Sequence, residues 1–175
     1  MVLIFMAKMK YFVSLGSNLG DRARHLKQAR LLLEKSGARI LRQSSVYETE
    51  PVDYQNQPWF YNQVLEVEIA CNPISFLDLV KDIEQKMRRR PSFDKGPRVI
   101  DIDILLAEKT VVQTQRLMIP HPRMSFRNFV MIPLSEIAPD LIHPLLHQPL
   151  VEIARNTGDT SLVRKVEEAS QQLAL

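Results

Sequence analysis

The sequence predicts a single α+β domain in which helices pack on the faces of an antiparallel sheet. Two observations indicate this class. Segments whose apolar residues alternate with the period of a strand are interspersed with segments whose apolar residues keep helical spacing. In addition, 175 residues, 45% of them hydrophobic and 25% charged, are enough for one well-packed core and too few for two comfortable ones.

The first part of the chain contains three predicted strands and one predicted helix. An apolar strand over 10–15 ends at the glycine-containing turn 16–20. A helix then begins at Asp21, a residue that favours helix N-termini, and ends at Gly37. Two further strands are predicted over 39–47 and 62–70, the second with strict alternation of apolar and polar faces.

The second part repeats the pattern. A helix begins at Asn72 and Pro73, continues to Met87, and is favoured by proline in its first turn. A basic segment, 88–96, leads to an apolar strand over 99–106 and a short return strand over 110–113. The order β-α-β-β-α-β predicts a ferredoxin-like core, an arrangement that supports many functions and does not decide among them.

The remaining segments complete the predicted domain. A short helix is expected near 125–132 and a final helix over 161–173. We therefore expect one domain over 1–175, with a core of about 10–150, a short N-terminal extension 1–9 and a helical tail 151–175.

Composition argues against several classes of protein. A net charge of +3 is too small to indicate nucleic-acid binding by itself. The single cysteine, Cys71, permits no internal disulfide, and no apolar run approaches the length of a membrane span. The N-terminal apolar run also lacks the features of a signal peptide. We expect a cytoplasmic monomer that binds neither nucleic acid nor membrane.

Asp101 and Asp103 interrupt the apolar strand 99–106. Residues two apart in a strand lie on one face, roughly 6.5–7 Å apart. Such a pair is either the solvated face of a half-exposed strand or a site for a hard cation such as Mg²⁺, which prefers oxygen ligands. Arg98, next to the pair, suits phosphate. Carboxylates and arginines together are the components of phosphoryl-type transfer, although the chain has no P-loop motif.

Several motifs together resemble a known family. They lie in order between residues 10 and 149: SLGSNLGDR, VYETEP, NQPWFYNQV, GPRVIDIDILL and IPHPRMSFRNFVMIPLSEIAP. In this order and spacing the chain resembles 6-hydroxymethyl-7,8-dihydropterin pyrophosphokinase of the folate pathway. The resemblance implies a ferredoxin-like fold. It also implies transfer of the β,γ-diphosphate of ATP to the pterin hydroxymethyl group, with release of AMP.

The resemblance also implies a role for each residue of the site. For the metal, it implies that two Mg²⁺ ions are held by Asp101 and Asp103. For catalysis, it implies Arg98, Arg89 and Arg90, with the register of the last two open by one residue. For ATP, it implies contacts with Glu84, Arg98, Arg116, His121 and Arg127. For the pterin, it implies contacts with Thr49, Val52, Phe60, Asn62 and Phe129.

Simpler interpretations exist for single residues. Phe60 and Phe129 could be ordinary core aromatics. His121 could be a surface loop residue, and the arginines at 88–90 a solvated helix end that favours the helix dipole. The chain also departs from many members of the family at Lys95 and Pro122, which bears on the details of the nucleotide pocket.

Two other functions use similar elements. RNA-recognition domains share the β-α-β-β-α-β order but need aromatic residues and positive charge on the central strands, where this chain has Asp101 and Asp103. A two-metal nuclease would want further carboxylates near this pair, and the sequence shows none nearby.

Overall fold

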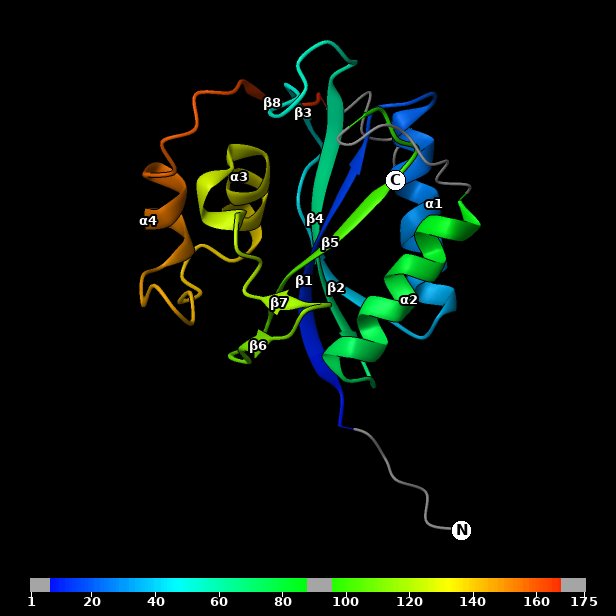
Figure 1. Ribbon diagram of the computed structural model, residues 1–175, viewed down its shortest axis with the longest axis vertical. Helices are drawn as coiled ribbons and strands as arrows, with labels where there is room; N and C mark the ends of the chain where they lie inside the picture. The colour runs from blue at the N-terminus through cyan, green and yellow to red at the C-terminus, as the bar shows by residue number, and fades with distance from the viewer. Residues whose placement is uncertain (1–6, 88–95, 168–175) are drawn as a thin grey trace.

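The computed structural model describes residues 7–87 and 96–167 and shows a six-stranded antiparallel sheet between two layers of helices (Figure 1). The elements are β1 (Met9–Ser17), α1 (Arg22–Lys35), β2 (Arg39–Gln43), β3 (Tyr47–Thr49), β4 (Phe60–Ile69), α2 (Pro73–Lys86), β5 (Asp101–Ala107), β6 (Val112–Gln113), β7 (Met118–Ile119), a 3₁₀ turn (Met124–Phe126), α3 (Asn128–Ile137), α4 (Leu150–Arg155) and β8 (Val163–Lys165). Among them no helix is long and apolar enough to cross a membrane.

The strand order confirms the predicted ferredoxin-like core. The sheet runs β5-β1-β4-β3-β8, with β2 also paired to β4, and every pairing is antiparallel. Strands β6 and β7 form a separate hairpin beside β5. Both β1 and β4 lie inside the sheet. Along each of these strands, alternate side chains therefore face the α1–α2 layer and the α3–α4 layer.

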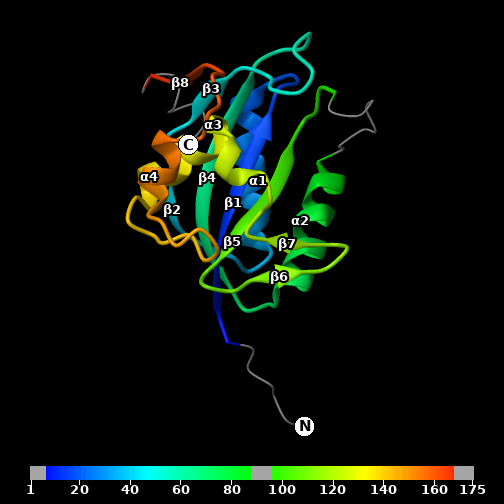
Figure 2. The ribbon, with the colours of Figure 1, turned by 60° about the vertical axis from the view of Figure 1, so that its left-hand side comes forward.

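Each face of the sheet has its own core. Helices α1 and α2 cover one face, and α3 and α4 cover the other, as Figures 1 and 2 show. In β4 the expected alternation is present: Leu65 and Val67 belong to the α1–α2 core, and Val64 to the α3–α4 core. A bulge in β5 opposite Phe12 and Val13 lets both Leu105 and Leu106 reach the α3–α4 core.

Both predicted helix starts are capped as expected. The Asp21 side chain accepts a hydrogen bond from the Arg24 N–H at 3.0 Å, and Asn72 accepts one from the Ser75 N–H at 2.9 Å. These bonds satisfy amide groups that have no partner within the helix. Both helices pack their apolar residues against the same face of the sheet.

The predicted strand 39–47 is wrong as one continuous element. It divides into β2 and β3 because Ser44 enters the ladder, where its hydroxyl accepts the Val64 N–H at 2.9 Å. The register against β4 changes by one residue across this point, from Gln43 opposite Leu65 to Tyr47 opposite Asn62. An irregularity of this kind re-aims the strand that follows it.

The predicted helix over 161–173 is also wrong in its described part. Val163–Lys165 forms β8, which pairs with the edge of β3, and residues 168–173 lie outside the described part of the chain. Helix α4 lies earlier, at Leu150–Arg155, so the tail 151–175 is not helical throughout. The open edge of β3 offers backbone partners that no periodicity in the tail could reveal.

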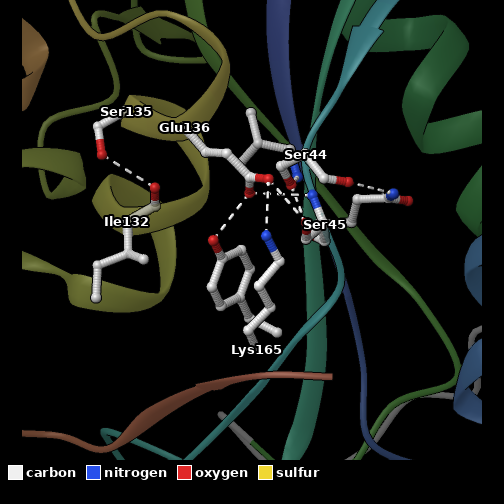
Figure 3. A network of polar contacts seen from close by, with 9 residues as sticks. Ser44, Ser45, Ile132, Ser135, Glu136 and Lys165 are labelled. Carbon is white, nitrogen blue, oxygen red and sulfur yellow. Dashed lines mark hydrogen bonds and ion pairs between the residues drawn. The ribbon is translucent and has the colours of Figure 1, made fainter. Parts of the chain in front are cut away.

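The short helix expected near 125–132 is a 3₁₀ turn followed by the longer α3, and Glu136 of α3 organises its packing on the sheet (Figure 3). The Glu136 carboxylate accepts hydrogen bonds from the Ser45 N–H at 3.0 Å, the Ser45 hydroxyl at 2.7 Å and the Tyr47 hydroxyl at 2.8 Å. The Lys165 Nζ atom of β8 lies 3.5 Å from the Glu136 Oε1 atom. Partial burial opposes the charge, but the hydrogen bonds outweigh it and hold the pKa of Glu136 below its ordinary value.

Substitution Glu136→Gln should therefore destabilise the fold in a pH-dependent way. Loss of the charged acceptor should lower the free energy of unfolding by about 1–2 kcal/mol at pH 7. A carboxyl with a depressed folded pKa stabilises the protein above its unfolded pKa and loses that effect as pH falls. The difference in the free energy of unfolding between the variant and the parent should thus become smaller below about pH 4. Denaturant titrations at several pH values measure it.

Glu152→Gln on α4 is the matched control, since the Glu152 carboxylate pairs with Arg155 of the same helix at 2.8 Å on the protein surface. Equal losses for both variants, or a Glu136→Gln difference that does not change with pH, would contradict this account.

Candidate active site

The site is built on one row of residues across the sheet. Gly16 of β1 lies opposite Asp101 of β5 on one side and opposite Asn62 of β4 on the other. Directly opposed residues in antiparallel strands extend to the same face. The next row inward contains Asp103, opposite Ser14. The carboxylate pair and the Asn62 amide therefore share the face that α3 and α4 partly cover.

Gly16 provides the space between the two halves of this row. A Cβ atom at this position would lie 2.8 Å from the Asn62 Oδ1 atom, closer than real Cβ contacts occur. Asn62 is 3% exposed, and its Nδ2 donates to the Thr49 Oγ1 at 2.6 Å. Thr49 in turn lies opposite Phe60. The amide is thus held in place beside a gap that only glycine leaves open.

The Asp103 carboxylate is electrostatically costly in the protein without a ligand. Burial, followed by the neighbouring charge of Asp101, raises the pKa of Asp103 to about 6. The period-two prediction that both acids lie on one face is confirmed by their register opposite Gly16 and Ser14. Within residues 7–87 and 96–167, no group of three or more His, Cys, Asp or Glu is arranged to hold a metal ion.

Arg98 lies beside the carboxylates. Its guanidinium is 3.3 Å from the Asp101 Oδ2 atom and 5.5 Å from the centroid of the Phe60 ring. The Arg98 Nε is buried and finds no hydrogen-bond partner in the described part of the chain. A buried, unsatisfied guanidinium N–H is suited to an incoming oxyanion such as phosphate.

Asn18 fixes the backbone from which Arg98 extends. The Asn18 Oδ1 accepts the Arg98 N–H at 2.9 Å, and the Asn18 N–H donates to the Arg98 carbonyl at 3.2 Å. The Asn18 Nδ2 donates to Gln57 at 3.0 Å and to the Pro58 carbonyl at 2.9 Å. The turn after β1 thereby connects the Arg98 segment to the loop before Phe60.

Arg127 approaches the same cluster from the start of α3. Its guanidinium lies 5.4 Å from the centroid of the Phe129 ring and 3.4 Å from the Asp53 Oδ2 atom. Burial lowers the pKa of Arg127, as do the charges of Arg123 and Arg98, while Asp53 and Asp103 act in the opposite direction. Arginines 98, 123 and 127 and the carboxylates therefore form one interacting group.

His121 is neutral in this group. Burial, then the charges of Arg127 and Arg123, lowers the pKa of His121 to about 4. Its Nδ1 accepts the Arg123 N–H at 3.2 Å, so the neutral ring carries its proton on Nε2. At neutral pH, His121 can donate one hydrogen bond without adding charge.

Three of the residues predicted for the pterin lie together at the Asn62 end of the row. Thr49, Phe60 and Asn62 are joined by the β3–β4 pairing, and Val52 follows in the next loop. Phe60 and Phe129 are half-buried, and each has an arginine over its ring. Phe129 also packs against the α3–α4 core, which fits the simpler interpretation of a core aromatic, whereas Phe60 belongs to neither core.

Some predicted residues lie apart or serve other contacts. Arg116 sits near the β6–β7 hairpin, where it pairs with Asp78 of α2 on the surface. Glu84 is 2% exposed and accepts the Ile102 N–H at 2.8 Å. Their roles in nucleotide binding stay predictions. Arg89 and Arg90 lie outside the described residues.

Sequence reasoning assigned no role to several residues of the site. These are Gly16, Asn18, Asp53 and Arg123. Gly16 and Asn18 belong to the SLGSN turn, which was noted only as the end of a strand and as part of a motif. Their roles depend on which strands flank β1, and a local pattern does not contain that information.

The fold is a ferredoxin-like α+β sandwich, and one face of its sheet brings together a carboxylate pair, arginines and a buried amide. The family model described as 7,8-dihydro-6-hydroxymethylpterin-pyrophosphokinase matches residues 12–139. The chain belongs to this family, and membership confirms the predicted reaction class, pyrophosphoryl transfer from ATP to hydroxymethyldihydropterin in folate biosynthesis.

Individual relatives agree with the family. The 2-amino-4-hydroxy-6-hydroxymethyldihydropteridine pyrophosphokinase of Bacillus subtilis is 42% identical over 127 residues, which cover 72% of this chain and 76% of the relative. The enzyme of the same name from Aquifex aeolicus is 40% identical over 141 residues, covering 81% and 88%.

Other relatives are much longer. The folic acid synthesis protein fol1 of Schizosaccharomyces pombe is 44% identical over 142 residues, but this chain spans only 19% of its length. The crystal structure of Plasmodium falciparum HPPK-DHPS with pterin and p-hydroxybenzoate matches with a TM-score of 0.71 at 18% identity, covering 89% of this chain and 42% of that one. This likeness shows the fold.

The electrostatic cost at the carboxylate pair leads to a prediction. Asp103→Asn keeps the shape of the side chain and removes a buried charge next to Asp101. The metal-free variant should melt at the same temperature as the parent or slightly higher, because functional sites commonly trade stability for activity. Its turnover should fall by at least about 10²-fold. Thermal melts in the presence of a chelator test the expected melting temperature, and activity assays with saturating Mg²⁺ test the expected loss of turnover.

Asp82→Asn, on the exposed face of α2 where Asp82 pairs with Lys86 at 2.6 Å, is the matched control and should keep full turnover. An Asp103→Asn protein that melts several degrees lower yet keeps parental turnover would make the carboxylate structural.

The close approach at Gly16 leads to a second prediction. Gly16→Ala would place a methyl group against the Asn62 amide, which must then move or lose its bond to Thr49. The KM for the pterin should rise by about 10-fold, because a displaced amide leaves polar groups of the ring unpaired. The affinity for an ATP analogue should hardly change. Equal losses of affinity for the pterin and for the ATP analogue would mean that Gly16 is needed for the structure of β1 and not for the ring site.

Proposed function

We propose that this chain is a Mg²⁺-dependent enzyme that transfers the β,γ-diphosphate of ATP to the hydroxymethyl group of 6-hydroxymethyl-7,8-dihydropterin and releases AMP. The observation that carries the proposal is the row Asp101–Gly16–Asn62. It sets groups for a metal–phosphate complex and an amide for the ring on either side of one glycine, which suits a reaction that joins two bound substrates.

The cationic side chains neutralise the triphosphate. The Arg98 guanidinium, with its unsatisfied Nε–H, donates to phosphate oxygens, and Arg127, whose charge interacts with those of Arg98 and Asp103, adds further positive charge. His121, neutral with its proton on Nε2, donates a further hydrogen bond. Donors fixed in a partly buried site stabilise charge that develops on a leaving oxygen.

Asp101 and Asp103 are the residues that would hold Mg²⁺. Their side chains offer only oxygen, and Mg²⁺ in such enzymes is held by one or two carboxylates together with substrate phosphates. The absence of a larger acidic group among the described residues fits this mode of binding. When bound, the ion would supply charge neutralisation and Lewis acidity at the phosphates.

The pterin end selects and orients the acceptor. The ring is flat and carries hydrogen-bond donors and acceptors along its edge. The buried Asn62 amide reads that edge, and Phe60 and Phe129 offer apolar faces for stacking. Orienting the hydroxymethyl oxygen toward the carboxylate end supplies the proximity that a reaction between two bound molecules requires.

Several finer points stay predictions. They are the number of Mg²⁺ ions, expected to be two, the monomeric state, the cytoplasmic location and the extent of the single domain over 1–175. The nucleotide contacts of Arg116 and Glu84 and the catalytic roles of Arg89 and Arg90 are also predictions.

Product analysis tests the proposal. With ATP, Mg²⁺ and the pterin alcohol, the protein should release AMP in amounts equal to the pterin consumed, and omission of the alcohol or chelation of the metal should stop release. ADP as the product would indicate a single-phosphate kinase. AMP or ADP formed at the same rate without the alcohol would indicate a hydrolase. Either result would overturn the proposal.

A further inference from the structure

The segment after α4 makes contacts that the functional site depends on. We call residues 157–165 the C-terminal bracket; in Figures 1 and 2 it runs from the end of α4 to β8, beside β3. The sequence suggested that this region is a tail outside the core. In the structure it contacts the start of α3 and the end of β3, and both elements carry site residues.

The bracket supplies the cap that α3 lacks. Arg127, at the N-cap position of α3, makes no side-chain cap bond. Instead, the Asp159 Oδ2 atom accepts the Asn128 N–H at 2.8 Å. A carboxylate at this position satisfies an otherwise unpaired amide and interacts favourably with the helix dipole.

The Asn128 side chain is held from the same segment. Its Nδ2 donates to the Asp159 carbonyl at 2.7 Å, and its Oδ1 accepts the Thr157 hydroxyl at 2.6 Å. Three hydrogen bonds thus converge on one residue from a segment about thirty residues later in the chain. Such convergence fixes both the backbone and the side chain at the first turn of α3.

Asn128 lies between Arg127 and Phe129, the residues that α3 contributes to the site. With Asn128 fixed, its neighbours can extend only in the directions that the first helical turn allows. Partial burial opposes the charge of Asp159, but bonds from Asn128 and Ser161 and the charge of Arg127 hold the pKa of Asp159 below its usual value. The carboxylate therefore stays ionised and also acts on the Arg127 charge.

The bracket contacts the pterin end as well. The Glu50 N–H donates to the Leu162 carbonyl at 3.1 Å, and the Leu162 N–H donates to the Glu50 carboxylate at 2.8 Å. Glu50 directly follows Thr49 and comes two residues before Val52. One short segment therefore connects the elements on which the Arg127–Phe129 side and the Thr49 side of the site are built.

We propose that Asp159 is a positioning residue that fixes Asn128 and thereby sets the directions of Arg127 and Phe129 toward the two substrates. The inference rests on the proposed function. Asp159 touches neither substrate. It acts through the start of α3, so its loss should change catalysis more than a stabilising cap elsewhere on the surface would.

Asp159→Asn is the direct test. It keeps the shape, removes the charge and leaves one oxygen for the two amides of Asn128 and Ser161. Measured well below its melting temperature, the variant should lose about 10-fold or more in kcat/KM for the pterin, because a shift of about 1 Å in a positioned group can cost 10²-fold. Thr157→Val removes the hydroxyl bond to Asn128 and the bond that this hydroxyl accepts from the Asp159 N–H at 3.2 Å, and it should show a loss in the same direction.

Asp140→Asn is the matched control, since Asp140 is exposed just beyond the other end of α3. A double-mutant cycle with Arg127→Ala separates an effect of Asp159 on the position of Arg127 from an effect on the stability of the fold. Asp159→Asn should weaken binding of a nonhydrolysable ATP analogue by about 10-fold in the parent and little in the Arg127→Ala background.

The possible outcomes distinguish a failure of the inference about Asp159 from a failure of the proposed function. An active parent, with Asp159→Asn matching Asp140→Asn in all constants and differing only in melting temperature, would overturn the inference and leave the function intact. Equal effects of Asp159→Asn in both backgrounds would also overturn it. A parent that releases no AMP would overturn the proposed function, and the inference with it.

Discussion

The antiparallel pairing of β1 with both β4 and β5 is the constraint on which the site depends. It sets Gly16 between Asn62 and Asp101, so that the amide proposed to bind the ring and a carboxylate proposed to hold the cation share one row. Neighbouring strands lie about 4.8 Å apart, which makes the separation of the two groups a property of the sheet. The loops then need only bring charge and apolar faces to positions that the backbone has already defined.

The charges around this row explain why the site needs both carboxylates and arginines. Without ligand, Asp103 is disfavoured in its ionised form by burial and by Asp101. The charges of Lys81 and Arg127 offset part of this cost, and Arg127 carries a cost of its own, because burial lowers its pKa. A metal–triphosphate complex carries both signs of charge and can relieve both groups together. Under the proposed function, the site is complementary to such a complex at some expense to the protein without it.

The parts of the fold that were predictable from sequence are those with local causes. The period of 99–106 placed Asp101 and Asp103 on one face, and the capping residues Asp21 and Asn72 located two helices. The division of 39–47 was not predictable, because it arises when Ser44 bonds to Val64 on another strand. In the same way, β8 forms only because β3 has an open edge, and helical spacing in the tail concealed it.

The same distinction applies to the site. Asp101, Asp103 and Arg98 could be identified because their chemistry is concentrated in one short motif. The importance of Gly16 depends on an atom of Asn62, which is far away in sequence, and the contribution of Asp159 depends on contacts with Asn128. Such residues have ordinary identities, and only the three-dimensional arrangement shows what they touch.

The most direct test of the account is a crystal structure of the protein with Mg²⁺, a nonhydrolysable ATP analogue and the pterin alcohol. The account predicts metal on Asp101 and Asp103, the ring edge on the Asn62 amide, and the hydroxymethyl oxygen about 3–3.5 Å from the β-phosphorus near Gly16. A triphosphate bound away from the two carboxylates, or a ring bound on the α1–α2 face, would contradict it.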